Sequence, residues 1–192
     1  MPKLGMYALR RRQLMEAAVA VIARHGLEQA TVAAIAQAAD LSPGIIRHYF
    51  GSKDELLEAT VRHLQKRLKR AVHARTRHAQ TPHDKVVAII EGNFAPEQFE
   101  PQAVSAWLAF WSQSASRRPS LLRIRRVHIA RLRHNLAFWL SRLVERPRAQ
   151  RIAFGLSAYI DGLWVTAALE GGLTPVQASR LAREYVTCML RG

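Results

Sequence analysis

The side chains best suited to molecular recognition lie in the stretch TVAAIAQAADLSPGIIRHYF at residues 31–50. Its second half carries small and polar residues that can face outward together, namely Ser42, Gly44, Arg47 and His48. Hydroxyl, guanidinium and imidazole groups on one exposed helix face can form hydrogen bonds with base edges in the major groove of DNA. These residue types therefore favour the recognition of a base sequence.

Two short helices must hold these side chains in place. The apolar positions have the spacing that buries one side of each helix against the other, at Ala36, Ala39, Leu41, Ile45, Ile46 and Tyr49. Residues 40–42 form the turn, Ser42 is suited to cap the second helix, and Pro43 is suited to its first position. This pattern predicts a helix-turn-helix. An ordinary helical hairpin inside a core would show the same short pattern.

The residues that flank this motif favour contact with phosphates. Thr31 is placed to cap the first short helix, where its hydroxyl and the free N–H groups beside it suit a phosphate oxygen. Ser52 and Glu55 form a capping box that puts Lys53 at a helix N-terminus, where its charge opposes the helix dipole. A nearby phosphate explains that lysine better than helix energetics do. The arginine triplet at residues 10–12 suits phosphate contact and a solvated helix start equally well.

The composition bounds the class of protein. The 192 residues include 29 Lys and Arg against 14 Asp and Glu, a net charge of +15, which suits DNA or an acidic membrane surface. The single cysteine, Cys188, excludes an internal disulfide and falls in an apolar helical pattern, which predicts inert packing. No apolar run approaches the ~20 residues of a membrane span, and the basic start lacks the apolar stretch of a secretory signal. We expect a soluble, cytoplasmic protein without a membrane partner.

The rest of the chain has helical spacing and no alternating strand pattern, which predicts an all-α fold of about nine helices. Residues 1–8 are expected to form a short arm. The helices expected after it are 10–26, the two of the motif, 53 to the high seventies, one from 81, one around WLAFW at 107–111, 119–146, one that can start at Pro147 and runs to 169, and 174–189. In the helix 119–146, Val127 and Leu143 are among the apolar positions expected to pack inward.

The last two helices predict self-association. The segment 151–169 is apolar on nearly all sides, which a helix tolerates only when two surfaces cover it. The last helix has one apolar stripe, which consists of Ala178, Leu181, Ala182, Tyr185 and Met189. Pairing of both helices with their symmetry mates would make a four-helix bundle, so we expect a homodimer.

The motif ending in HYF, the segment GSKDELL at the start of a long helix, and the helical C-terminal body resemble the TetR family of one-component transcriptional regulators. This resemblance is strong over residues 9–60. More narrowly, the segments MPKLGM, RRRQL, GIIRHYF, KDELLEATVRHL, IIEGNF, WLAFW and IDGLW resemble the choline-responsive repressors of glycine betaine synthesis within that family. We therefore expect a helix-turn-helix DNA-binding domain at residues 1–52 and a helical ligand-binding and dimerisation domain at residues 53–192.

The resemblance also implies roles within the motif. The recognition helix would be 43–49, with Tyr49 and Lys53 on phosphates of double-stranded operator DNA. Asp40 stands where the family usually has glycine, and aspartate tolerates the left-handed backbone better than most residues. Arg47 stands where betaine-type members have serine and can contact a guanine with two hydrogen bonds, so their operator sequence does not carry over. The predicted DNA-binding residues are Thr31, Ser42, Pro43, Gly44, Arg47, His48, Tyr49 and Lys53.

A choline-like effector would need aromatic faces and nearby negative charge, because a quaternary ammonium has no hydrogen-bond donor on nitrogen. Trp107, Phe110 and Trp111 share one helix face, and Asp161 and Trp164 share another. Asp161 stands in an apolar helix, where its carboxylate needs a bound cation or an arginine. Core packing is the ordinary role of each tryptophan. Weaker candidates for the same pocket are Asn93, Phe94 and Tyr159.

Seven arginines occur between residues 117 and 133 with no acidic residue among them. A solvated face is the default interpretation, and one of them is the alternative partner of Asp161. They are Arg117, Arg118, Arg123, Arg125, Arg126, Arg131 and Arg133.

The sequence features bear on four candidate functions. The main prediction is a homodimeric repressor of betaine-synthesis genes that choline or a relative releases from DNA, a role in osmoregulation. The alternative is a TetR-type regulator of another small molecule, such as a lipophilic cation or drug. An enzyme is disfavoured, because no HExxH, GxSxG or phosphate loop occurs, and we expect no catalytic residue, metal or cofactor. A non-specific coating protein would bind random and promoter DNA equally.

Overall fold

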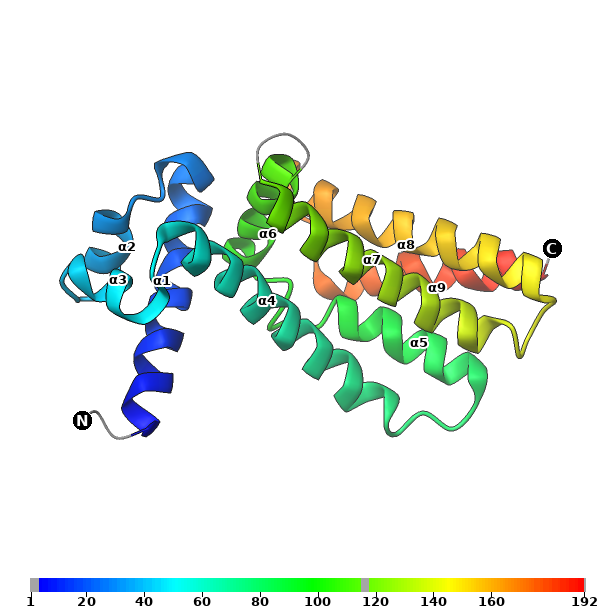
Figure 1. The fold of residues 1–192 in the computed structure, drawn as a ribbon. Helices are drawn as coiled ribbons and strands as arrows, with labels where there is room; N and C mark the ends of the chain where they lie inside the picture. The colour runs from blue at the N-terminus through cyan, green and yellow to red at the C-terminus, as the bar shows by residue number, and fades with distance from the viewer. Residues whose placement is uncertain (1–3, 115–117, 192) are drawn as a thin grey trace. The chain divides into compact units, whose positions relative to one another are not determined.

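The computed structural model describes residues 4–114 and 118–191 (Figure 1). These residues form nine α-helices and no strand, which confirms the predicted all-α fold. The helices are α1 (Leu4–Gln29), α2 (Val32–Ala38), α3 (Gly44–Phe50), α4 (Lys53–Thr76), α5 (Pro82–Asn93), α6 (Pro101–Ser114), α7 (Pro119–Leu140), α8 (Arg146–Leu169) and α9 (Pro175–Arg191). Two compact units result. Unit 1 holds the described residues of Met1–Leu64 and Pro101–Ile124, and unit 2 those of Gln65–Glu100 and Arg125–Gly192.

Unit 1 is built on α1, which packs against α2, α3 and α6. Nearly fully buried side chains from three helices form its core, and they include Leu14, Ile22, Ile35 and Ile46. A seven-residue helix such as α2 or α3 is unstable in isolation, so this burial, at roughly 1.5–3 kcal/mol for each large apolar side chain, is what stabilises both. The position of the motif therefore depends on α1.

The first helix is longer at its start than the sequence predicted. α1 begins at Leu4, so residues 4–8 are helical and the expected arm is wrong for them. The ring of Tyr7 lies 4.9 Å from the ring of Tyr49, and this contact favours a helix that reaches α3. Gly26 breaks the regular helix with φ 77 and ψ 169, close to the predicted end.

Local signals set the beginning and end of α2 as predicted. The side-chain oxygen of Thr31 accepts a hydrogen bond from the Ala34 N–H at 3.1 Å and so caps the helix. Asp40 follows the helix with φ 54, the left-handed conformation that its position in the turn requires. An aspartate at this position is therefore compatible with the turn.

The start of α3 differs slightly from the prediction. The helix begins at Gly44, and Pro43 precedes it with helical φ −55 and ψ −34. No side chain caps this end; instead the Ser42 carbonyl oxygen accepts a hydrogen bond from the Ile45 N–H at 3.0 Å. The predicted hydroxyl cap by Ser42 is wrong, because Pro43 rather than Ser42 stands directly before the helix.

Unit 2 contains α5, α8 and α9, with α9 packed against both of the others, together with the second half of α4 and most of α7. Gly92 lets α5 approach α4 closely, because an added Cβ would lie 2.5 Å from the Val72 Cα. The largest fully buried side chains here are Phe94, Ile90, Leu136, Leu140 and Leu156.

The predicted starts of α5 and α9 are confirmed by reciprocal capping. In α5 the Thr81 side chain accepts from the Asp84 N–H at 3.1 Å, and the Asp84 carboxylate accepts from the Thr81 N–H at 3.2 Å. In α9 the Thr174 N–H donates to the Gln177 side chain at 2.9 Å, and the Gln177 N–H donates to the Thr174 hydroxyl at 3.2 Å.

The end of α7 was predicted too late in the chain. The helix stops at Leu140 rather than near residue 146, because two backbone hydrogen bonds after it join residues three apart instead of four. The Leu143 N–H donates to the Leu140 carbonyl at 2.9 Å, and the Arg142 N–H donates to the Trp139 carbonyl at 3.2 Å. Leu143 is 38% exposed and Val127 is 43% exposed, so neither belongs to the core.

The last two helices expose apolar side chains in the described chain. Phe154 and Leu169 of α8 are 57% and 72% exposed. By length and composition α8 would suffice to cross a membrane, with 39% of its apolar window buried, which corrects the expectation that no segment comes near. The core helix of a soluble protein passes the same test.

The packing of α9 also corrects two details. Ala178 and Ala182 are buried as predicted, whereas Leu181 and Tyr185 are only partly buried. Val186 is buried although it was not among the predicted positions. Met189 is 41% exposed and Cys188 is exposed, so the prediction that this cysteine packs inertly is wrong for the described chain.

Candidate nucleic-acid interface and ligand-binding residues

The recognition helix α3 has one buried and one exposed side. Ile46, Tyr49 and Phe50 are buried, which anchors the helix in unit 1. The four residues that the sequence predicted to face outward are exposed, namely Ser42, Gly44, Arg47 and His48, and Pro43 is exposed as well. This face carries a guanidinium, an imidazole and a hydroxyl without a large apolar side chain, so it can offer hydrogen bonds to base edges.

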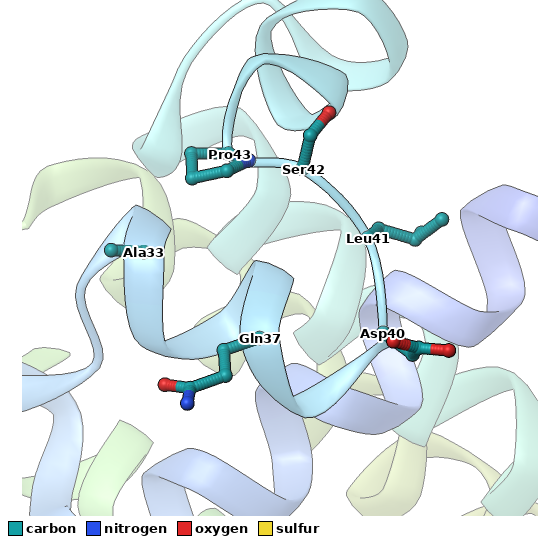
Figure 2. Close-up of a pocket in the computed structure, with 6 residues that line it drawn as sticks. All are labelled: Ala33, Gln37, Asp40, Leu41, Ser42 and Pro43. Carbon is teal, nitrogen blue, oxygen red and sulfur yellow. The ribbon is translucent and has the colours of Figure 1, made fainter.

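A shallow hollow of about 440 Å³ lies beside this face, and Figure 2 shows its lining residues. Ala33 and Gln37, one turn apart, project from the same side of α2. The side chain of Asp40 points away from that side, so its negative charge does not lie on the surface that Gln37 occupies. Sequence reasoning missed Gln37, although a polar residue in the otherwise apolar α2 was a usable signal. Leu41, Ser42 and Pro43 complete the lining.

The C-terminal end of α3 is tied to α1. The Arg11 guanidinium donates a hydrogen bond to the Tyr49 carbonyl and lies 4.1 Å from the centre of the Phe50 ring. The Tyr7 hydroxyl is 3.5 Å from the same carbonyl. A cation at a helix C-terminus is favoured by the helix dipole, so Arg11 positions α3. The sequence left this residue open between phosphate contact and solvent.

Tyr49, which the resemblance placed on a phosphate, is largely buried at 7% exposed. Its ring lies 4.9 Å from the ring of Tyr7, at a tilt of 40°, and 4.9 Å from the ring of His48, edge-on. Any phosphate contact would therefore use the edge of this side chain that stays at the surface.

Lys53 stands at the first residue of α4, as predicted, and Ser52 accepts a hydrogen bond from the Glu55 N–H at 3.2 Å. Partial burial, and then the positive charge of Arg118, lower the pKa of Lys53, while Asp54 acts to raise it. Arg118 itself pairs with Asp54, so the acidic neighbour of the lysine is already engaged. A phosphate would offset the electrostatic cost at this lysine.

Three of the predicted ligand-binding residues lie in α6, in unit 1. Trp107 and Phe110 are 4% and 2% exposed, and Trp111 is partly exposed. The rings of Trp107 and Trp111 have centroids 6.1 Å apart and are tilted by 43°. The shared face predicted from their spacing is therefore present, with two of its members in a core.

Another aromatic cluster lies in unit 2. The Phe99 ring packs edge-on against Phe94 at 5.4 Å and against Trp164 at 5.0 Å. Asn93 is buried and its side-chain nitrogen donates to the Ile89 carbonyl of its own helix at 2.8 Å. Phe99 was missed by the sequence reasoning because it stands in the loop between two prolines, outside any helical pattern.

The remaining candidates of unit 2 are Asp161 and Tyr159. The Asp161 carboxylate is 3.7 Å from the Arg125 guanidinium, with the two side chains 26% and 35% exposed. Burial raises the pKa of Asp161, although the charges of Arg125 and Arg133 act to lower it. The Tyr159 ring stacks on Tyr185 at 5.0 Å, on the α9 side of α8.

The arginine-rich segment is only partly a solvated face. Arg118 pairs with Asp54, Arg125 pairs with Asp161, and Arg133 donates to the Ser157 hydroxyl at 2.9 Å with its guanidinium 4.2 Å from the Phe154 ring. The arginines that are exposed are Arg123, Arg126 and Arg131. Arg117 lies outside the described residues.

The chain matches two family models. The model "Bacterial regulatory proteins, tetR family" matches residues 14–60, and "BetI-type transcriptional repressor, C-terminal" matches residues 82–191. The HTH-type transcriptional regulator BetI of Brucella suis is 43% identical over 194 residues, which cover 100% of this chain and 97% of that protein. The protein of the same name from Paraburkholderia phytofirmans is 44% identical, over 99% and 98% of the two chains.

Solved structures share the fold. A transcriptional regulator from Pseudomonas aeruginosa PAO1 is similar with a TM-score of 0.83 and 29% identity, over 96% of this chain and 92% of that one. A transcriptional regulator from Saccharomonospora viridis in complex with choline is similar with a TM-score of 0.76 and 21% identity, over 94% and 96%. This chain therefore belongs to the TetR family of transcriptional regulators, and within it to the BetI-type repressors.

Proposed function

We propose that this repressor binds operator DNA as a homodimer, through residues 31–50 of each protomer, and that choline or a related quaternary ammonium compound modulates the binding and so controls betaine-synthesis genes. Residues 1–52 would act as the DNA-binding domain, and residues 53–192 would bind the effector and dimerise. The exposed face of α3 beside its buried anchor is the observation that carries the DNA-binding part. A regulator of this kind acts in the cytoplasm, where the DNA is.

The contacts with DNA divide by chemistry. Arg47 and His48 are exposed on α3 and would read base edges, with Arg47 able to hold a guanine with two hydrogen bonds. Ser42, Pro43 and Gly44 would let the backbone at the start of the helix come close to the groove. The residues proposed to hold phosphates are Thr31, Tyr49 and Lys53. Phosphate contacts position the protein, whereas base contacts specify the sequence.

The effector proposal rests on the BetI-type match over residues 82–191 and on the choline complex of a protein with the same fold. The chemistry of the candidates agrees with a cation, since aromatic faces attract a quaternary ammonium. The candidates proposed are Trp107, Phe110 and Trp111 of unit 1 and Asn93, Phe94, Tyr159, Asp161 and Trp164 of unit 2.

A second candidate function is regulation by a different small molecule, such as a lipophilic cation or drug. Within this second class the ion pair of Asp161 with Arg125 favours an uncharged drug over a cation, because the carboxylate that would balance a bound cation already has a positively charged neighbour at 3.7 Å. A choline-like ligand would have to share Asp161 with Arg125 or displace it, at a cost in desolvation.

Footprinting on DNA that flanks the gene, with and without choline, tests both parts. We expect protection of paired half-sites about one DNA turn, ~34 Å, or more apart, and loss of protection when choline is added. Protection that ignores choline would leave the repressor standing and favour the second candidate. Equal protection of random and promoter DNA at fixed salt would contradict sequence-specific binding, which we expect to exceed non-specific binding by roughly a thousandfold.

A further inference from the structure

A hollow of about 360 Å³ opens in unit 2 and is framed by α4, α5 and α7. We call it the α4–α5–α7 hollow. None of its lining residues belongs to the proposed DNA or effector sites. It is lined by Lys69, Val72, His73 and Thr76 of α4, Arg77 directly after α4, Lys85 and Ile89 of α5, and Asn135 and Trp139 of α7.

The hollow has an apolar base. Val72 is partly exposed, Ile89 is only 2% exposed, and the Trp139 ring is partly exposed. Because Gly92 lets α5 lie against the Val72 backbone, the two helices hold this base at a fixed spacing. A flat apolar group placed there would cover surface that now meets water, which is worth about 25 cal/mol per Å².

The polar lining is basic. Lys69, Arg77 and Lys85 line the hollow together with His73, and no carboxylate is part of its lining. The second half of α4 and the residue after it, residues 65–77, contain six Lys and Arg and no Asp or Glu. The carboxylate of Glu97 is the acidic partner described for this stretch, and it faces Arg75 at 3.9 Å. The potential in the hollow is therefore positive.

Two of the cations are held in place by the protein. The Lys85 ammonium donates to the Thr76 carbonyl at 2.7 Å and lies 5.4 Å from the centre of the Trp139 ring, so it is fixed over the base. Arg77 donates through Nε to the His78 ring at 2.7 Å, which uses one of the five N–H donors of its guanidinium. The Lys85 contact also stabilises the C-terminal end of α4, so that cation has a structural role with or without a ligand.

We propose that the α4–α5–α7 hollow is a second effector site, which binds a small aromatic carboxylate. The ring lies on Val72, Ile89 and Trp139, and the carboxylate is held by Lys69, Arg77 and Lys85. This ligand is opposite in charge to a choline-like effector, and its site is made of other residues. Binding braces the second half of α4 against α5 and α7, and α4 is the helix that begins with Lys53.

Calorimetric titration of the full chain with 1-naphthoate tests the proposal, with neutral 1-naphthalenemethanol as the matched compound. We expect naphthoate to bind at least about tenfold more tightly, since a charge-assisted hydrogen bond contributes roughly 1.5–3 kcal/mol. The variant Lys69→Gln/Arg77→Gln should lose at least that factor, and Trp139→Leu should weaken both compounds. The heat measured when choline is titrated into Lys69→Gln/Arg77→Gln should equal that of the unmodified chain. This result would separate the hollow from the proposed effector site.

Two controls keep the test specific. Arg70→Gln removes an exposed cation from the same helix outside the hollow, and Arg146→Gln changes a different basic hollow, lined also by His134, Phe138 and Arg142. Both should bind naphthoate like the unmodified chain. The proposal would be overturned if titration with naphthoate gave no heat, or if the neutral compound bound as tightly as naphthoate. It would also be overturned if either control variant lost as much naphthoate affinity as Lys69→Gln/Arg77→Gln.

Discussion

Arg47 is exposed on α3, and the resemblance implies that serine is the betaine-type residue at its position. We predict that Arg47→Ser weakens operator binding by about 1–3 kcal/mol and relaxes the preference for one base pair in each half-site, because a bidentate guanine contact is lost. Mobility-shift titrations with operators changed one base pair at a time measure both effects. Arg24→Ser, at an exposed position late in α1, is the matched control. An equal loss on every DNA sequence would instead identify Arg47 as a phosphate contact.

The pH dependence of stability should be visible at His128. Burial, and then the charges of Arg125 and Arg131, lower the pKa of His128 from 6.5 to about 4. Between those values the unfolded chain binds a proton at this residue and the folded chain does not, so the free energy of unfolding falls as the pH falls from 6.5 towards 4. Asp161, whose pKa is raised, acts in the opposite direction.

The comparison that isolates His128 uses His128→Gln. Between pH 6.5 and pH 5 the histidine should cost the unmodified chain about 2 kcal/mol of stability, from 1.36 kcal/mol per pH unit. Urea unfolding at pH 7.5 and at pH 5 should therefore show a smaller loss for the variant. If both proteins lose the same amount, the acid sensitivity comes from other groups.

At the scale of elements, Gly92 sets the approach of α5 to α4. In Gly92→Ala the new Cβ would lie 2.5 Å from the Val72 Cα and 2.9 Å from its backbone nitrogen, so the helices must separate. We predict a net loss of roughly 1–3 kcal/mol in the free energy of unfolding, although alanine itself favours a helix by about 1 kcal/mol. Gly5→Ala in α1 meets no atom within 4 Å and should not destabilise. Thermal unfolding of both variants measures the difference.

Features encoded within three or four residues could be predicted from the sequence. The cap at Thr31 and the helix starts at residues 81 and 174 were predicted because the donor and acceptor of each capping bond are close neighbours in the chain. Two contacts could not be predicted from the sequence, because tertiary packing selects partners that are 38 and 36 residues apart. They are the hydrogen bond from Arg11 to the Tyr49 carbonyl and the ion pair of Arg125 with Asp161. The fold class followed from periodicity, whereas the end of α7 depended on a local tightening that periodicity does not encode.

At the scale of the whole molecule, the net charge of +15 predicts DNA binding that weakens steeply with salt. Lys53→Gln should lower the slope of log affinity against log salt by about 0.9 per protomer, or roughly 1.8 for a dimer, if each Lys53 holds one phosphate. Stability should not fall, since the substitution removes a charge that opposes the dipole of α4. Titrations at several salt concentrations measure the slope, with Lys66→Gln on the same helix as control. Equal slopes for all three proteins would remove Lys53 from the interface.

The exposed apolar side of α8 gives the last prediction, which concerns assembly. Phe154 is 57% exposed and stacks under the Arg133 guanidinium at 4.2 Å, so Phe154→Arg places a second positive charge on that surface. If α8 and α9 form the dimer interface, the variant should sediment near the 21.6 kDa of one chain, keep its helical circular dichroism, and bind a two-half-site operator at least tenfold more weakly. Phe138→Arg, at a 45% exposed position of α7, should remain a dimer. A dimeric Phe154→Arg with full affinity would place the interface on another surface.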